Sequence, residues 1–488
     1  MISISIEDIC FATNGTLKFS AEIAGTCIDS ISTDTRTINK NDLFIALKGP
    51  SFDAHDLLSS AVEKGASVLL IEKSSRFVFS EVEKASSVVV EVEDTRIALG
   101  LLGSFIKQKI KGLKCAAITG SNGKTTCKEL LSAILVAHCG SADKVLATAG
   151  NFNNDIGLPL TLFRLQSQHQ FAVVELGANH VGEIAYTSAL AKPDVALVNN
   201  IMPAHLEGFG SLEGVAKAKA EIWSHLGATG VAVVNLDANF ALQFIQQLQH
   251  KQQPILCFST SVENEAMLNP DVFATDITFN ALGQASFTLN YQQNVLSQTV
   301  DIQLNLPGKH NVSNALAAST MALALGCSLA DIQQGLNDVQ QVAGRVNCSA
   351  LSEHLTVIDD TYNANSASVR AGIDLLAQYS GQHLLICGDM GELGEYAEQE
   401  HQVVGEYALQ HHIERLFTVG NLSQLATNAY NAASLNEGAT HFQNKDQLKL
   451  AIKSYLSNEK NNVVVLIKGS RSAKMEEIVA FIKENFSA

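Results

Sequence analysis

The fold of this chain is decided by residues 113–126, which read Leu113-Lys114-Cys115-Ala116-Ala117-Ile118-Thr119-Gly120-Ser121-Asn122-Gly123-Lys124-Thr125-Thr126. The apolar run that ends at Thr119 predicts a buried strand, and the residues from about Thr125 to Ala137 predict a helix. Glycines in the turn between them let backbone N–H groups face a polyphosphate, and the helix N-terminus adds positive potential. Lys124 can reach the β- and γ-phosphates, and the Thr125 hydroxyl can ligate Mg²⁺. The stretch therefore predicts a nucleotide-binding loop within a parallel α/β sheet.

The loop is a shortened variant, because Ile118 stands where the strict Walker pattern has a glycine. An ordinary turn ahead of Lys-Thr is the alternative, but the strand before it and the helix after it favour phosphate binding. The residues predicted to surround the phosphates are Gly120, Ser121, Asn122, Gly123, Lys124, Thr125 and Thr126. The loop indicates a nucleotide and leaves the reaction open.

Length and composition restrict the class of protein. A chain of 488 residues exceeds what one hydrophobic core normally serves, so two to four domains are expected. A net charge of −16 argues against a general nucleic-acid binder, because phosphate neutralisation needs clustered Lys and Arg. The nine cysteines include no C-x-x-C pair, which favours reduced thiols over a disulfide frame or a zinc site. No apolar run approaches the ~18 residues of a membrane helix, so we predict a cytoplasmic protein without a membrane anchor.

Three regions differ in their pattern of apolar residues. Residues 1–90 alternate short strands with a helix over 54–64, which predicts a small α/β domain. Residues 91–340 contain apolar strands at 113–119, 171–175, 195–198 and 231–235, followed by period-two alternation between Val272 and Leu306. This pattern predicts a P-loop-type domain with antiparallel hairpins at one edge. Residues 341–488 alternate strands and helices again, which predicts a C-terminal Rossmann-like domain.

Polar residues follow two further strands of the predicted central sheet. Glu175 ends the strand over 171–175, and His205 follows the strand over 195–198. Ligands gather at the carboxyl ends of parallel strands, so these residues and the phosphate loop could meet in one crevice. Lys217 and Lys219 lie two positions apart on a predicted helix and point to roughly opposite sides, so we expect one of them to face solvent.

Motifs along nearly the whole chain, from about residue 30 to about residue 478, resemble those of the Mur ligases. The segments that carry the resemblance are Thr119–Thr126, Gly150–Gly157, Glu175, His205–Ser211, Ala218–Ile222, Leu306–Leu316, Ala343–Arg345, Asp359–Ser366 and Lys468–Ser472. The forms Gly-Asn-Phe-Asn-Asn-Asp-Ile-Gly, Asp-Asp-Thr-Tyr-Asn-Ala-Asn and Lys-Gly-Ser-Arg-Ser resemble the members that add D-alanyl-D-alanine. Phe52-Asp53-Ala54-His55-Asp56 does so as well.

The resemblance implies ATP as a substrate, two Mg²⁺ ions and a carbamate on Lys219. It implies that Thr125 and Glu175 hold one ion, and that His205 and the modified Lys219 hold the other. Further nucleotide contacts are implied for Asn154, Asn311, Asn314, Arg345 and Asp360. Contacts with the other substrates are implied for Thr33, Asp34, Thr35, Arg36, Phe52, Asp53, His55, Tyr362, Asn363, Asn365, Lys468, Ser470 and Arg471.

The resemblance also implies a reaction. ATP would phosphorylate the terminal carboxylate of UDP-N-acetylmuramoyl-tripeptide, and the amine of D-alanyl-D-alanine would attack the acyl phosphate. The catalytic set would be Lys124, Glu175, His205, Lys219 and Arg345, acting in a monomer. The alternatives are a family member that adds a single amino acid such as meso-diaminopimelate, a folylpolyglutamate synthase-like ligase, and a nucleotide switch. The sequence leaves open whether the third residue of the tripeptide is diaminopimelate or lysine.

Overall fold

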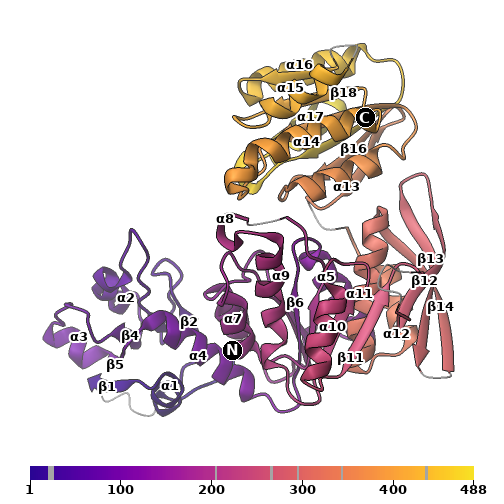
Figure 1. The fold of residues 1–488 in the computed structure, drawn as a ribbon. Helices are drawn as coiled ribbons and strands as arrows, with labels where there is room; N and C mark the ends of the chain where they lie inside the picture. Colours follow the sequence, from indigo (N-terminus) through magenta and orange to yellow (C-terminus); the bar gives the residue numbers. More distant parts are fainter. Residues whose placement is uncertain are drawn as a thin grey trace.

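The computed structural model describes residues 1–19, 27–203, 206–263, 268–293, 296–341, 344–434 and 438–487. They form three sheets, one in each of three consecutive lobes (Figure 1). The three-domain α/β architecture agrees with the predicted fold class. No helix in the described ranges combines the length and the apolar character needed to cross a bilayer.

The first lobe is a five-stranded sheet in the order β1-β5-β4-β3-β2, with β1 antiparallel to β5 and the other pairs parallel. Its elements are α1 (Ile6–Thr13), β1 (Thr16–Phe19), β2 (Ile31–Ser32), β3 (Leu43–Ile45), η1 (Ala54–Leu57), α2 (Leu58–Glu63), β4 (Val68–Glu72), α3 (Glu81–Ser86) and β5 (Val88–Val92). The predicted helix over 54–64 is thus a 3₁₀ turn followed by a short α-helix. The first sheet extends two residues past the predicted boundary at residue 90, because β5 ends at Val92.

The central lobe is a nine-stranded sheet in the order β14-β13-β12-β11-β10-β9-β6-β8-β7. Its strands are β6 (Lys114–Thr119), β7 (Val145–Ala147), β8 (Phe171–Glu175), β9 (Val195–Val198), β10 (Val231–Asn235), β11 (Ile255–Ser259), β12 (Val272–Phe279), β13 (Gln284–Gln293) and β14 (Leu296–Pro307). Its helices are α4 (Thr95–Gln108), α5 (Lys124–Cys139), η2 (Ala142–Lys144), α6 (Gly157–Leu162), α7 (Glu183–Ala191), α8 (Leu206–Phe209), α9 (Leu212–Ala220), η3 (Glu221–His225), α10 (Ala241–His250), α11 (Lys309–Leu325) and α12 (Leu329–Asp338). The strands from β6 to β12 pair in parallel, and β12, β13 and β14 form the antiparallel edge that the alternation predicted.

The third lobe is a six-stranded sheet in the order β15-β16-β20-β17-β18-β19, parallel except for β15. Its strands are β15 (Asn347–Ser352), β16 (Leu355–Asp360), β17 (Gln382–Gly388), β18 (Arg415–Val419), β19 (Ala439–Phe442) and β20 (Val463–Lys468). Its helices are α13 (Ser366–Leu376), η4 (Gly394–Tyr396), α14 (Ala397–Gln410), α15 (Gln424–Ala433), α16 (Lys445–Asn458), η5 (Arg471–Ala473) and α17 (Glu476–Phe486). Helices cover both faces of this sheet, as expected for a Rossmann-like domain.

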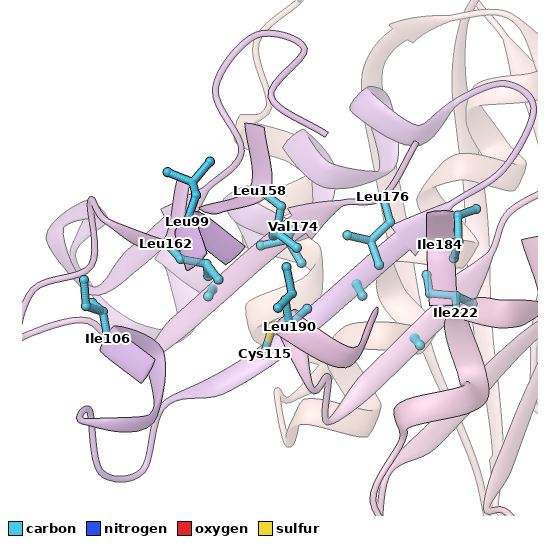
Figure 2. Packing of buried hydrophobic residues seen from close by; sticks show 14 of the residues in the cluster. Leu99, Ile106, Cys115, Leu158, Leu162, Val174, Leu176, Ile184, Leu190 and Ile222 are labelled. Carbon is cyan, nitrogen blue, oxygen red and sulfur yellow. The ribbon is translucent and has the colours of Figure 1, made fainter. Parts of the chain in front are cut away.

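Helix α4 joins the first lobe to the second. Its N-terminus is capped by the Asp94 carboxylate, which accepts from the backbone N–H groups of Arg96 and Ile97. Leu99, Leu102 and Ile106 recur at helical spacing and are fully buried. Figure 2 shows Leu99 close to Leu158 and Leu162 of α6, with Ile106 farther along α4, beside residues of the central sheet. One apolar core therefore serves both lobes and fixes the first sheet against the second.

Candidate functional site

The phosphate loop connects the carboxyl end of β6 to the first turn of α5. Gly123 adopts φ +77°, and a Cβ there would lie 2.5 Å from Asn314 Oδ1 and 2.6 Å from Asn199 Nδ2. A side chain at this position would meet both steric and conformational strain. The loop is therefore packed tightly against the residues behind it.

Residues after the neighbouring strand β9 hold the loop in place. Ser121 Oγ donates to the Met202 carbonyl at 2.9 Å, and the Asn122 N–H donates to Asn200 Oδ1 at 2.8 Å. Asn199 Nδ2 donates to the Asn122 carbonyl at 3.0 Å. Sequence reasoning missed Asn199 and Asn200, although an Asn-Asn pair directly after the strand next to the loop was the available signal.

Lys124 opens helix α5 and lies over the loop. Its Nζ donates to the Gly120 carbonyl at 2.7 Å. Desolvation lowers the pKa of Lys124 and nearby Arg345 lowers it further, whereas Glu175 and Glu392 act in the opposite direction. Lys124 and Glu175 stand at the carboxyl ends of neighbouring parallel strands, β6 and β8, and so lie on the same side of the sheet.

Glu175 ends β8 with its carboxylate directed into the protein. The residue is 2% exposed, and its Oε1 accepts no hydrogen bond from any described residue. The closest cation is Lys128, whose Nζ lies 3.9 Å from this oxygen. A buried carboxylate oxygen without a hydrogen-bond donor is costly unless a cation occupies the site in the working state.

The two lysines of α9 differ sharply in burial. Lys217 is exposed, whereas Lys219 is 1% exposed, which confirms the expectation that they face opposite sides. Within the described residues no hydrogen bond or ion pair reaches Lys219 Nζ, and the ring of Phe209 lies 6.0 Å away. Burial, and then the charge of Lys124, hold the pKa of Lys219 well below its ordinary value. A lowered pKa increases the share of this buried amine that is in its neutral, nucleophilic form.

Two residues of the third lobe reach the phosphate loop. Arg345 Nη2 donates to Thr125 Oγ1 at 2.9 Å, and its guanidinium lies 4.0 Å from the ring centre of Tyr362. Asn365 Nδ2 donates to Asn122 Oδ1 at 2.7 Å. The structure thus brings Lys124, Thr125, Glu175 and Lys219 into one neighbourhood with Arg345. The predicted partner His205 lies outside the described residues.

The residues predicted near the adenine and the ribose have protein partners. Asn314 Oδ1 accepts from Asn199 Nδ2 at 3.0 Å, and Asn311 Nδ2 donates to the Pro307 carbonyl at 2.8 Å. Lys468 is 2% exposed and donates to Asp360 Oδ2 at 2.5 Å and to the Asn363 carbonyl at 3.0 Å. Buried in this way, Lys468 holds the loop after β16 and presents no free ammonium group to a substrate.

The predicted first-lobe residues lie on two loops beside β2 and β3. Arg36 Nη2 pairs with Asp34 Oδ2 at 2.6 Å at the surface, and this arginine lowers the pKa of Asp34 to about 2. Phe52 is 56% exposed and can meet a ligand. His55 is 5% exposed, with Nδ1 2.5 Å from Asp53 Oδ1, while Nε2 accepts from the Glu72 N–H at 3.0 Å. Both ring nitrogens are engaged, so His55 holds its loop and is not free to bind a ligand.

The remaining predicted residues divide between exposed and buried positions. Thr33 and Thr35 are half-buried beside the Asp34–Arg36 pair, and Thr126 is half-buried in the first turn of α5. Asn154 Oδ1 accepts from the N–H of Gly157, the first residue of α6, at 2.8 Å. Ser470 is buried and its Oγ lies 3.0 Å from Ser472 Oγ, whereas Arg471 is exposed near Tyr362.

The oxygen atoms near Lys124 are of the kinds that bind a magnesium ion. Glu175 supplies a buried carboxylate oxygen and Thr125 supplies a hydroxyl, and Mg²⁺ prefers such hard ligands. No cluster of three or more His, Cys, Asp or Glu side chains suited to a metal occurs among the described residues. This pattern suits an ion held by one carboxylate together with substrate phosphates rather than by a cage of protein ligands.

Comparison with known proteins gives matches along nearly the whole chain. Profiles described as "Mur ligase family, catalytic domain", "Mur ligase middle domain" and "Mur ligase, glutamate ligase domain" match residues 27–106, 118–322 and 344–471. The UDP-N-acetylmuramoyl-tripeptide–D-alanyl-D-alanine ligase of Escherichia coli (strain K12) is 40% identical over 485 residues, which is 99% of each chain. The protein of the same name from Haemophilus influenzae is 40% identical over 462 residues, 94% of each chain. A crystal structure of MurF from Acinetobacter baumannii has a TM-score of 0.88 at 35% identity, covering 99% of this chain and 100% of that chain.

Proposed function

The chain belongs to the Mur ligase family, and from that premise we propose that it joins D-alanyl-D-alanine to UDP-N-acetylmuramoyl-tripeptide with release of ADP and phosphate. The observation that carries the proposal is the similarity to ligases of that name from one end of the chain to the other. A match to the central lobe alone would support only a nucleotide-dependent enzyme. The outer lobes, which would hold the organic substrates, match as well.

The chemistry explains why the site gathers cations. A carboxylate resists attack by an amine because of its negative charge and resonance. Transfer of the γ-phosphoryl group of ATP to the terminal carboxylate of the tripeptide gives an acyl phosphate. The amine of the dipeptide then attacks the acyl carbon, and phosphate leaves from the tetrahedral intermediate. No protein nucleophile takes part in this sequence of steps, so catalysis rests on positioning and on neutralisation of charge.

We assign the charged residues accordingly. Lys124 leaves the Gly120 carbonyl to contact the phosphates, and Arg345 turns from Thr125 toward the transferred group. Thr125 and Glu175 would hold a Mg²⁺ ion, which supplies charge neutralisation at the phosphates when it is bound. In its neutral form the amine of buried Lys219 can add to CO₂ and release a proton to give a carbamate, an anionic oxygen ligand that would suit a second ion. His205 is its proposed partner.

The three lobes would divide the substrates between them. We propose that residues 1–90 anchor the uridine-linked substrate through the Asp34–Arg36 loop and exposed Phe52. Residues 91–340 bind ATP, and residues 341–488 bind the incoming dipeptide beside Tyr362 and Arg471. Approach of the third lobe to the phosphate loop excludes water from the acyl phosphate, which would otherwise be hydrolysed.

The proposal is tested by ATP turnover with UDP-N-acetylmuramoyl-tripeptide, measured with and without D-alanyl-D-alanine, followed by the mass of the product. We expect ADP release to depend on both substrates and the product to gain the dipeptide. Parallel assays with diaminopimelate- and lysine-containing tripeptides identify the accepted third residue. Product formed with a single amino acid in place of the dipeptide would disprove the assignment.

Lys219→Ala tests the proposed metal ligand within the same assay. We expect loss of activity that added bicarbonate does not restore, because the alanine variant has no amine to modify. Lys217→Ala, two residues away on the exposed side of α9, is the matched control and should retain activity. Full activity of the Lys219 variant would refute the ligand role.

A further inference from the structure

A third buried lysine, Lys128, lies one helical turn beyond Lys124 and takes no part in the mechanism above. Lys128 is 3% exposed, although lysine is among the residues least often buried. Its Nζ donates to the Thr148 carbonyl at 2.8 Å, pairs with Glu129 Oε1 at 2.6 Å and lies 3.9 Å from Glu175 Oε1. A buried ammonium group is stable only when it is paired in this way.

The partners of Lys128 belong to three elements that meet at the site. Lys128 is on α5, the helix that begins at the phosphate loop. Thr148 directly follows β7, and its Oγ1 accepts from the Glu175 N–H at 3.0 Å. Thr148 therefore links Lys128 to the end of β8, because its carbonyl accepts from Lys128 and its hydroxyl accepts from Glu175. One side chain thus fixes the ends of two strands relative to the nucleotide-binding helix.

The segment that starts at Thr148 continues toward the first lobe. Residues 149–156 form the loop between β7 and α6, and the Gly177 N–H donates to the Asn153 carbonyl at 2.8 Å. Asp155 pairs with Arg96 at the start of α4, where Arg96 Nη2 lies 2.9 Å from Asp155 Oδ1. The position of this loop therefore depends on where β7 ends relative to α5.

We infer that Lys128 is a positioning residue of this ligase: it holds the Glu175 carboxylate and the start of the 149–156 loop in register with the phosphate loop. The inference rests on the proposed function for the reaction that is assayed. The contacts of Lys128 do not depend on which substrate is joined. Glu175 Oε1 accepts no hydrogen bond from a described residue, and Lys128 Nζ at 3.9 Å is the cation paired with it. Residues that orient a metal ligand typically change metal affinity or activity by about 10- to 100-fold when they are removed.

The main competing explanation is that Lys128 only neutralises the negative charge of Glu129. Substitution of Glu129 separates this charge effect from the positioning role. Lys128→Met removes the cation but leaves Glu129 without its partner, so the site becomes more negative. The double variant Lys128→Met/Glu129→Gln restores the net charge without restoring the contacts to Thr148 and Glu175. Lys144→Met is the matched control, because Lys144 donates to the Cys139 carbonyl at the far end of the same helix.

The experiment measures kcat, KM for each substrate, and ADP affinity with and without Mg²⁺ by calorimetry. We expect both Lys128 variants to lose about 10- to 100-fold in kcat and most of the Mg²⁺-dependent tightening of ADP binding. KM for D-alanyl-D-alanine should not change, because the dipeptide is proposed to bind the third lobe. Glu129→Gln and Lys144→Met should stay within about twofold of the wild type.

Recovery of wild-type values in the double variant would overturn the inference, because Lys128 would then only neutralise Glu129. Unchanged kcat and metal coupling in Lys128→Met would overturn it as well. If Lys128→Met does not fold, Lys128→Gln keeps a donor for the Thr148 carbonyl and should show the same loss of metal coupling. If the wild-type protein forms no dipeptide adduct, the proposed function is contradicted instead. Comparison of Mg²⁺-dependent ADP binding between the wild type and the Lys128 variants still tests the role of Lys128.

Discussion

The central lobe meets its two neighbours through junctions of opposite character. Toward the first lobe, one apolar cluster contains residues of the first sheet, of α4 and of the central sheet, and Figure 2 shows the part of it around α4 and α6. Toward the third lobe, the clusters on either side stay separate, and those of the third lobe contain only residues from Val346 onward. Figure 1 shows the third lobe set above the central sheet, with α8 and α13 on facing sides.

The described contacts across the second junction are mainly polar and few. The Asn122 and Asn365 amides bond to each other, Arg345 bonds to Thr125, and Tyr379 Oη donates to the Leu282 carbonyl at 2.8 Å. Each such hydrogen bond contributes about 0.5–1.5 kcal/mol, whereas burial of one leucine contributes about 1.5–3 kcal/mol. Separating the lobes should therefore cost more free energy at the first junction than at the second. The proposed reacting groups lie at the second.

Leu99→Ala should have the largest effect, because it removes a fully buried side chain from the shared core. We expect a loss of about 2–5 kcal/mol in the free energy of unfolding of the first and second lobes together. The single tryptophan, Trp223, belongs to this cluster, so urea unfolding followed by its fluorescence reports the change. Leu448→Ala in the third lobe is the control, and the two variants should differ in the tryptophan midpoint. Equal shifts would mean that the three lobes unfold as one unit.

Arg345→Ala acts at the polar junction and should change activity rather than folding. Loss of this cation beside the phosphates should lower kcat by about 100-fold, with little change in the unfolding midpoint because the side chain is only half-buried. Arg370→Ala is the matched control, since its guanidinium lies 5.7 Å from the Tyr407 ring wholly within the third lobe. Activity retained in the Arg345 variant would remove the residue from the catalytic set.

Tyr379→Phe should have the smallest effect and the most local one. It removes the hydroxyl that donates to the Leu282 carbonyl across the junction and that also lies 3.3 Å from Cys348 Sγ within the third lobe, so about 0.5–1.5 kcal/mol of contact free energy is lost. Hydrogen exchange should rise at the turn between β12 and β13, and the unfolding midpoint should fall less than in Tyr430→Phe. In Tyr430→Phe the lost hydroxyl donates to Ile413 inside the third lobe, so that variant should lower the midpoint more. The reverse pattern would show that the junctions do not differ as described.

Much of the fold followed from the sequence, because buried parallel strands are continuous apolar runs. The strands over 171–175, 195–198 and 231–235 have the bounds that were predicted. Boundaries were less certain where packing decides them, as at β5, which extends past residue 90. No local pattern indicated that α4 would carry a core shared between two lobes.

The candidate site was predictable where a residue stands at the end of a strand. Lys124, Thr125 and Glu175 meet because β6 and β8 are neighbours in the sheet and end on the same side. His55 and Lys468 lie in motifs that resemble those of the Mur ligases, but their polar atoms form hydrogen bonds within the protein. Lys128 and Asn199 were missed because a helix lysine and a strand-end asparagine are common and usually solvated.

The sequence by itself determined the nucleotide loop, the order of strands and helices, and the family, since each depends on residues that are neighbours in the chain. The tertiary structure alone decided which polar groups remain free. Burial withdraws water, so a lysine or histidine must take whatever partner the fold places beside it, and that partner can lie a hundred residues away. For the same reason only the folded protein reveals one apolar junction and one polar junction around the central sheet.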